Sequence, residues 1–228
     1  MKHLKTTGII LSRTDYGEAD RILTVLTPDR GKLRLLARGV RKVKSKLAGG
    51  IELFSTSDIT FIEGRGELGT LISTRLIKHY GHIIDDIERV QLGYEIIKTL
   101  NRTTEDHPDQ EYYELLEQAF AALDDPGIDL TLIRLWFEAR LLDLAGHSPN
   151  LSTDTAGAKL EAGQKYDFDH ESMAFVPNGS GKYTASDIKV LRLLFSANPL
   201  EDINKVQGIG QALKNIEPLI RTTSRDFL

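Results

Sequence analysis

Short apolar or alternating runs separated by turn signals fill the first eighty residues. The runs cover residues 7–11, 22–27, 32–37, 57–62 and 68–77. Glycine, proline and aspartate mark turns between them, and five short strands at this spacing favour a small β-barrel. In the third run, a period of two directs Lys32 and Arg34 to one face and two leucines to the core.

From residue 81 onward the hydrophobic period becomes helical. The first predicted stripe consists of Ile83, Ile87, Val90, Tyr94 and Ile97. Two further stripes follow at 112–123 and 132–142, separated by a break at Pro126-Gly127.

The rest of the chain alternates between irregular and helical patterns. Residues 150–183 are rich in Gly, Ser, Thr and Asp, which predicts an irregular or lightly stranded insert. A capping box at residues 184–187 predicts a helix to Phe195, and a last helical stretch is expected at 202–220 with a break before Pro218. We therefore expect an α+β protein with domains at 1–80, 81–150 and 151–228.

Charge is distributed unevenly along the chain, whose net charge is −4. The first eighty residues contain 15 basic and 8 acidic side chains, whereas an acidic excess follows them. Residues 30–46, called here the basic segment, hold eight lysines or arginines and no acidic residue. This asymmetry predicts a surface for a polyanion, and the alternative is a solvated surface without a ligand.

Composition excludes several classes of protein. The chain has no cysteine, so disulfides and thiolate metal sites are absent. It has no apolar run long enough to span a membrane, and its N-terminal apolar stretch is too short for a signal peptide. We expect a cytoplasmic, soluble protein.

Motifs in the first half and at the C-terminus occur in the order and spacing of a known family. They include Tyr-Gly-Glu-Ala-Asp-Arg at 16–21, Arg-Gly-Lys at 30–32, Leu-Ala-Arg-Gly-Val-Arg at 36–41, Lys-Ser-Lys-Leu at 44–47 and Ser-Arg-Asp-Phe-Leu at 224–228. Together they resemble the RecO family of bacterial DNA repair and recombination mediators.

The resemblance implies an N-terminal OB-fold barrel, a helical domain and a small third module, without enzymatic activity or a cofactor. It also implies binding of single- and double-stranded DNA, strand annealing, and cooperation with RecR and the acidic tail of single-strand-binding protein so that RecA can load. Many relatives carry a four-cysteine zinc site that this chain lacks. Residues 151–181 must therefore keep their shape without zinc or have lost that module.

The basic segment supplies the expected DNA contacts, because lysine and arginine bind phosphates without reading sequence. The candidates are Lys32, Arg34, Arg38, Arg41, Lys42, Lys44 and Lys46. Tyr16, Phe54 and Phe61 are the local aromatic candidates for base stacking, and core packing is favoured for the two phenylalanines.

Two other arginines in this region lie next to predicted turns. Arg21 either faces phosphate or pairs with Asp20 or Glu18, and both alternatives stay open. Arg65 lies on a predicted hairpin tip.

Two further motifs suggest binding sites. Trp136, flanked by Arg134 and Arg140, suits an acidic peptide tail, although a tryptophan at helical spacing also suits a core. Gly208-Ile209-Gly210 resembles the turn of a helix-hairpin-helix motif, with a tight turn between packed helices as the alternative.

Other patterns do not predict a catalytic or metal site. Gly64-x-Gly66-x-x-Gly69 precedes a β-type run rather than a helix, so we interpret it as a hairpin turn and not a dinucleotide site. Histidine and aspartate residues at 79–86 and 167–170 lack metal-binding spacing. No catalytic triad can be assembled, so we predict no enzyme.

Two rival functions remain open. One is a protein-interaction adaptor whose basic patch binds acidic protein tails, and the other is an RNA-binding barrel.

Overall fold

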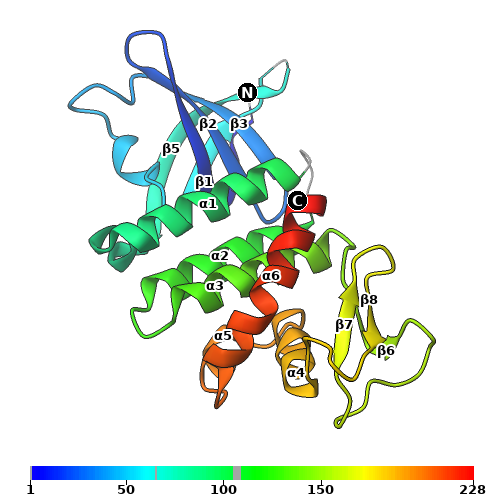
Figure 1. Ribbon diagram of the computed structural model, residues 1–228. Helices are drawn as coiled ribbons and strands as arrows, with labels where there is room; N and C mark the ends of the chain where they lie inside the picture. Colours follow the sequence, from blue (N-terminus) through cyan, green and yellow to red (C-terminus); the bar gives the residue numbers. More distant parts are fainter. Residues whose placement is uncertain (1, 65, 105–108) are drawn as a thin grey trace. The chain divides into compact units, whose positions relative to one another are not determined.

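The computed structural model describes residues 2–64, 66–104 and 109–228 (Figure 1). Two compact units divide the chain between residues 125 and 126. Unit 1 holds a β-barrel and two helices, and unit 2 holds further helices and a small sheet. The chain has the expected α+β architecture, and the expected domain boundaries at residues 80 and 150 stay a prediction.

A closed five-stranded barrel forms the first part of unit 1. Its strands are β1 (Leu4–Tyr16), β2 (Asp20–Thr27), β3 (Gly31–Ala37), β4 (Ser55–Ile62) and β5 (Leu68–His79). Their order around the barrel is β1-β2-β3-β5-β4, in which β3 and β5 pair in parallel and the other neighbours pair antiparallel. Each predicted strand lies within one of these strands, and the OB-like barrel is confirmed.

Alternation along the strands builds the barrel core, because successive side chains point to opposite faces. Buried apolar residues from all five strands form it: Ile10, Leu23, Leu35, Phe61 and Leu71 are examples. Phe54, just before β4, is buried as well. The expectation that Phe54 and Phe61 pack in a core is therefore confirmed.

Helices α1 (Ile87–Thr103) and α2 (Gln110–Asp124) follow a short 3-10 turn, η2 (Gly81–Asp85). The Asp86 carboxylate caps α1 by accepting hydrogen bonds from the N–H groups of Glu88 and Arg89, at 2.8 and 3.3 Å. Arg89 is buried and donates to the carbonyls of Leu123 and Asp125. This guanidinium joins the beginning of α1 to the end of α2.

The hydrophobic stripe that the sequence predicts for α1 is only partly correct. Ile97 is buried, whereas Ile87 is 69% exposed and Tyr94 is 50% exposed. The buried face instead includes Gly93, where an added Cβ would lie 2.5 Å from a ring carbon of Phe54. The Phe54 ring therefore packs closely against the helix backbone at Gly93.

Unit 2 combines helices with a three-stranded sheet. Its elements are α3 (Leu130–Leu144), β6 (Asn150–Asp154), β7 (Tyr166–Asp169), β8 (Ala174–Pro177), α4 (Ala185–Leu194), α5 (Leu200–Asn204) and α6 (Ile209–Phe227). The segment expected to be lightly stranded forms the sheet, in the order β6-β8-β7.

Aromatic packing and aspartate turns hold this small sheet. The rings of Tyr166, Phe168 and Tyr183 meet Phe175 edge-on, with centroids 5.2–6.1 Å apart. The Asp154 carboxylate accepts hydrogen bonds from two backbone N–H groups of the following turn, both at 2.9 Å. No cluster of three or more potential metal ligands occurs among the described residues.

One of the two helix boundaries predicted near the C-terminus is correct. Thr184 and Asp187 form the capping box, in which each side chain accepts a hydrogen bond from the other residue's N–H. The break before Pro218 is wrong, because α6 continues through this proline to Phe227. Proline removes one helical hydrogen bond, and burial of flanking residues such as Ile216 and Leu219 offsets that loss.

Candidate nucleic-acid interface

The basic segment runs along β3 and then through a series of turns that pack against the β1–β2 hairpin. The Gly39 N–H donates to the Asp20 carboxylate at 2.7 Å, and the Arg41 N–H donates to the Ala19 carbonyl at 3.0 Å. Gly39 has a φ of +63°, which glycine adopts without the strain of a Cβ. These contacts position the cations that follow β3.

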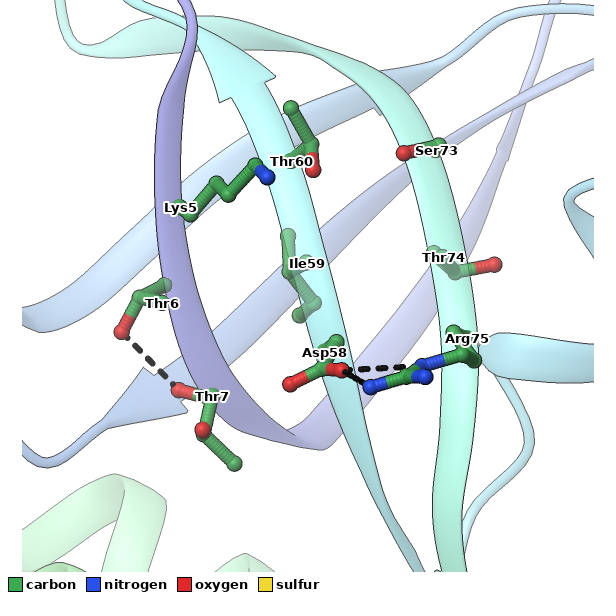
Figure 2. A pocket seen from close by; sticks show the side chains of 9 residues that line it. All are labelled: Lys5, Thr6, Thr7, Asp58, Ile59, Thr60, Ser73, Thr74 and Arg75. Carbon is green, nitrogen blue, oxygen red and sulfur yellow. Dashed lines mark hydrogen bonds and ion pairs between the residues drawn. The ribbon is translucent and has the colours of Figure 1, made fainter.

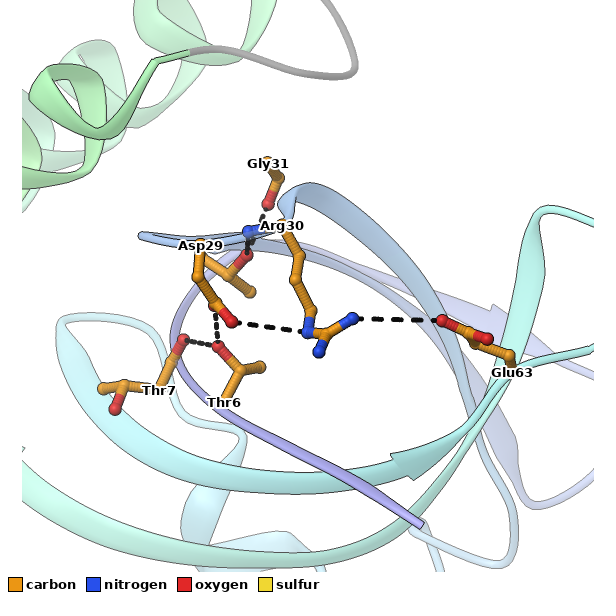
Figure 3. Close-up of polar contacts among 7 residues, drawn as sticks. Thr6, Thr7, Asp29, Arg30, Gly31 and Glu63 are labelled. Atoms are coloured by element: carbon orange, nitrogen blue, oxygen red, sulfur yellow. Dashed lines mark hydrogen bonds and ion pairs between the residues drawn. The ribbon is translucent and has the colours of Figure 1, made fainter. Parts of the chain in front are cut away.

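Three of the eight cations in the basic segment are already engaged by the protein. The first is Arg30, whose guanidinium lies 3.3 Å from the Asp29 carboxylate and 3.9 Å from that of Glu63 (Figure 3). The Asp29 carboxylate also accepts a hydrogen bond from the Thr6 hydroxyl. The positive charge of Arg30 is therefore balanced locally.

Lys32 is the second engaged cation. Its ammonium donates to the backbone carbonyls of Asn101 and Thr104, both at 2.7 Å. These carbonyls lie at the C-terminal end of α1, where the helix dipole favours a positive charge. The expectation that Lys32 projects toward DNA is thus corrected, because its ammonium joins β3 to α1.

Arg41 is the third engaged cation, since its guanidinium lies 3.5 Å from the Asp15 carboxylate. Arg21 donates to the same carboxylate at 2.8 Å. This hydrogen bond from Arg21, together with the charge of Arg41, lowers the pKa of Asp15. Arg21 pairs with neither Asp20 nor Glu18, because the antiparallel β1–β2 pairing places it directly opposite Asp15.

Five cations remain exposed and form no ion pair among the described residues. These five unpaired cations are Arg34, Arg38, Lys42, Lys44 and Lys46. Such charges are available to displace the counterions that surround a nucleic-acid backbone.

Two exposed side chains add contact surface near these cations. Tyr16 is 55% exposed and pairs across the β1–β2 hairpin with Asp20, the residue that fixes Gly39. Val43 is fully exposed between Lys42 and Lys44. Tyr16 is therefore the one local aromatic candidate for stacking that is accessible, since the two phenylalanines are buried.

The predicted peptide groove on the third helix is not formed around Trp136. The Trp136 side chain is only 2% exposed, because most of the surface of helix α3 is buried. Arg140 donates to the Asp143 carboxylate at 2.6 Å and to the Phe195 carbonyl at 3.0 Å. Arg134 is half-buried and lies close enough to Glu138 to affect its titration. A tail-binding role for the two arginines stays a prediction, whereas Trp136 belongs to the core.

Two remaining predicted features have the following positions. Gly208, with a φ of +77°, forms a turn immediately before α6, and the neighbouring Lys205 pairs with Asp202 at 3.0 Å. Arg65 lies outside the described residues.

The barrel topology and the five unpaired cations define an OB-like barrel protein with a surface suited to a polyanion. The family model "Recombination protein O N terminal" matches residues 1–80, and "Recombination protein O C terminal" matches residues 84–223. The chain therefore belongs to the RecO family of DNA repair proteins.

Individual relatives support the same assignment. A DNA repair protein RecO from Dehalococcoides mccartyi is 29% identical over 98% of this chain and 90% of its own length. The RecO from Roseiflexus sp. is 31% identical over 98% of this chain and 81% of its own. That of Halalkalibacterium halodurans is 32% identical over 64% of this chain and 58% of its own length.

None of the described helices is long and apolar enough to cross a membrane.

Proposed function

We propose that this RecO-family protein binds single- and double-stranded DNA without reading its sequence and anneals complementary strands. The observation that supports this most directly is the set of five unpaired cations on a segment anchored to the barrel. Contacts from lysine and arginine to phosphates position a nucleic acid but carry no sequence information.

Annealing follows from charge neutralisation. Two strands repel each other through their phosphates, and this repulsion weakens when both lie within about one Debye length, roughly 10 Å, of the same cations. Contacts that ignore sequence also let the strands slide until their bases are in register. No covalent step enters this proposal.

We further propose that the protein works with RecR and with the acidic tail of single-strand-binding protein, so that RecA replaces that protein on DNA in the bacterial cytoplasm. Family membership supports these partners. Arg134 and Arg140 are the candidate contacts for the tail, because they are the cations of α3 that keep partial exposure.

A strand-annealing assay on oligonucleotides coated with single-strand-binding protein tests the function. The wild type is expected to speed pairing, and Arg34→Ala/Arg38→Ala is expected to slow it. Lys98→Ala is the matched control, since it removes an exposed cation from α1, outside the basic segment. Failure of the wild type to speed pairing would remove the proposal.

A second candidate function is an adaptor that binds acidic protein tails. The exposed Val43 between two lysines favours it, because an apolar contact is of use to a peptide but not to a phosphate. An acidic peptide that binds the wild type, while DNA does not, would favour the adaptor. Tighter binding of RNA than of DNA with matched sequence would instead indicate an RNA-binding protein.

A further inference from the structure

A polar cleft of about 590 Å³ lies on the barrel face formed by β1, β4 and β5 (Figure 2). Five of the nine residues that line it carry hydroxyl groups, and one lining residue, Ile59, is apolar. Lys5 and Arg75 supply positive charge, and Asp58 supplies the negative charge. The cleft is separate from the basic segment, and its one link to the contacts described so far is the Thr6 hydroxyl, which donates to Asp29.

The strand register arranges the polar side chains of the cleft in two rows. Lys5 pairs with Thr60, and Thr60 pairs with Ser73, which gives a row across all three strands. Thr7, Asp58 and Arg75 form the second row in the same way. The rows are two residues apart, so both face outward, and their separation along the strands is about 7 Å.

Each row therefore offers one cation and at least one hydroxyl group. Hydroxyl groups and cations are the side chains that proteins use to contact phosphate and sugar oxygens. Successive phosphates of an extended single strand lie at a spacing similar to that of the rows. A sugar-phosphate chain thus matches the cleft better than a peptide with an apolar end, which needs more apolar surface than Ile59 supplies.

The ion pair between Arg75 and Asp58 holds the guanidinium over the cleft. Nε and Nη2 of Arg75 both donate to Oδ2 of Asp58, and Figure 2 shows these contacts across β4 and β5. The Arg75 side chain is 82% exposed. A phosphate can therefore approach the outer edge of the guanidinium, where it competes with Asp58.

Strand β5 connects the cleft with the basic segment. The Thr74 hydroxyl donates to the carbonyl of Leu47 at 3.2 Å, and Leu47 directly follows Lys46. Ser73 and Arg75, on either side of Thr74, belong to the two rows. A single strand of nucleic acid that leaves the five unpaired cations can therefore continue past β5 to the cleft.

We propose that this cleft is a second phosphate-binding site for single-stranded nucleic acid, which extends the path that begins at the five unpaired cations. The inference rests on the proposed DNA binding and adds a defined place on the barrel for the single-stranded nucleic acid. It predicts that short oligonucleotides occupy the basic segment alone, whereas longer ones also reach the cleft.

Oligothymidylates of about 6 and about 16 nucleotides test this, because these lengths lie near the lower and upper ends of the range that OB folds occupy, about 4–16 nucleotides. For Lys5→Ala/Arg75→Ala, binding of the longer oligonucleotide is expected to weaken about five- to tenfold. The salt slope is expected to become shallower by about 0.7, the contribution of Lys5, because Asp58 already balances the charge of Arg75. Binding of the shorter one is expected to stay unchanged. Unchanged binding of the longer oligonucleotide, or equal losses for both lengths, would overturn the proposal.

Asp58→Asn provides a variant with the opposite expected sign. It removes the carboxylate that competes for Arg75, so the longer oligonucleotide is expected to bind about two- to threefold more tightly. Damage to the barrel would not raise affinity, so a gain is specific to the freed Arg75. Unchanged or weaker binding by a variant that unfolds at the wild-type Tm overturns the proposal. Lys98→Ala is the control that removes an exposed cation outside both sites, and it should leave the binding of both lengths close to the wild-type value.

The outcomes separate the cleft from the proposed function. A wild type that binds neither oligonucleotide refutes DNA binding itself. A wild type that binds both lengths with the same affinity and salt slope refutes only the cleft. Loss of an acidic peptide's binding in Lys5→Ala/Arg75→Ala, with DNA binding intact, would assign the cleft to a protein partner instead.

Discussion

The salt dependence of binding tests whether the five unpaired cations contact phosphates. We consider Lys42→Ala/Lys44→Ala/Lys46→Ala and an oligothymidylate of about six nucleotides, short enough to occupy the basic segment alone. Each phosphate neutralised on a single strand contributes about −0.7 to the slope of log affinity against log salt concentration. Five contacts predict a slope near −3.5 for the wild type, and two remaining contacts predict about −1.4.

These slopes correspond to differences that are readily measured. Between about 50 and about 200 mM salt, the wild type is expected to lose about 100-fold in affinity, and the triple variant about sevenfold. Fluorescence anisotropy of a labelled oligonucleotide, titrated at several salt concentrations, gives both slopes.

Arg30→Ala is the matched control from the same basic segment. Its guanidinium is already balanced by Asp29 and Glu63, so its removal is expected to leave the slope near the wild-type value. A triple variant with the wild-type slope would refute the assignment of phosphate contacts. If Arg30→Ala made the slope shallower by about 0.7, the contribution expected of each lysine, the distinction between paired and unpaired cations would be refuted.

Three further predictions concern stability. Lys32→Met removes two hydrogen bonds from the end of α1 and is expected to cost about 1.5–3 kcal/mol in urea unfolding, and unchanged stability would contradict this role. Asp187→Ala removes the capping box of α4 and is expected to cost about 1–2 kcal/mol, whereas Asp187→Asn should lose less; equal losses would count against the cap. Burial raises the pKa of Glu138, so its folded form holds its proton more tightly than its unfolded form does. The protein should therefore lose stability as the pH rises from the ordinary glutamate range through the raised pKa, and Glu138→Gln should abolish that loss. Parallel curves of Tm against pH for the two proteins would contradict this expectation.

Local sequence patterns were sufficient to predict several features of the fold. The alternation in residues 22–27 and 32–37 depends on neighbouring positions, and both runs form barrel strands. The capping box of α4 spans four residues, so its signal is also local. Where a feature depends on contacts between distant residues, the same patterns failed, as at Pro218, where packing carries α6 past the expected break.

The same distinction between local patterns and distant contacts applies to the candidate site. The sequence alone determined that a cluster of cations lies near the N-terminal end, because charge density is a property of consecutive residues. Only the tertiary structure decided which of those cations are free: Lys32 meets carbonyls about seventy positions away, and Arg41 meets Asp15 across a hairpin. Burial of Trp136 and the two rows of the cleft likewise arise from folding. The physical reason is that pairing and burial depend on distances in space, which local periodicity does not specify.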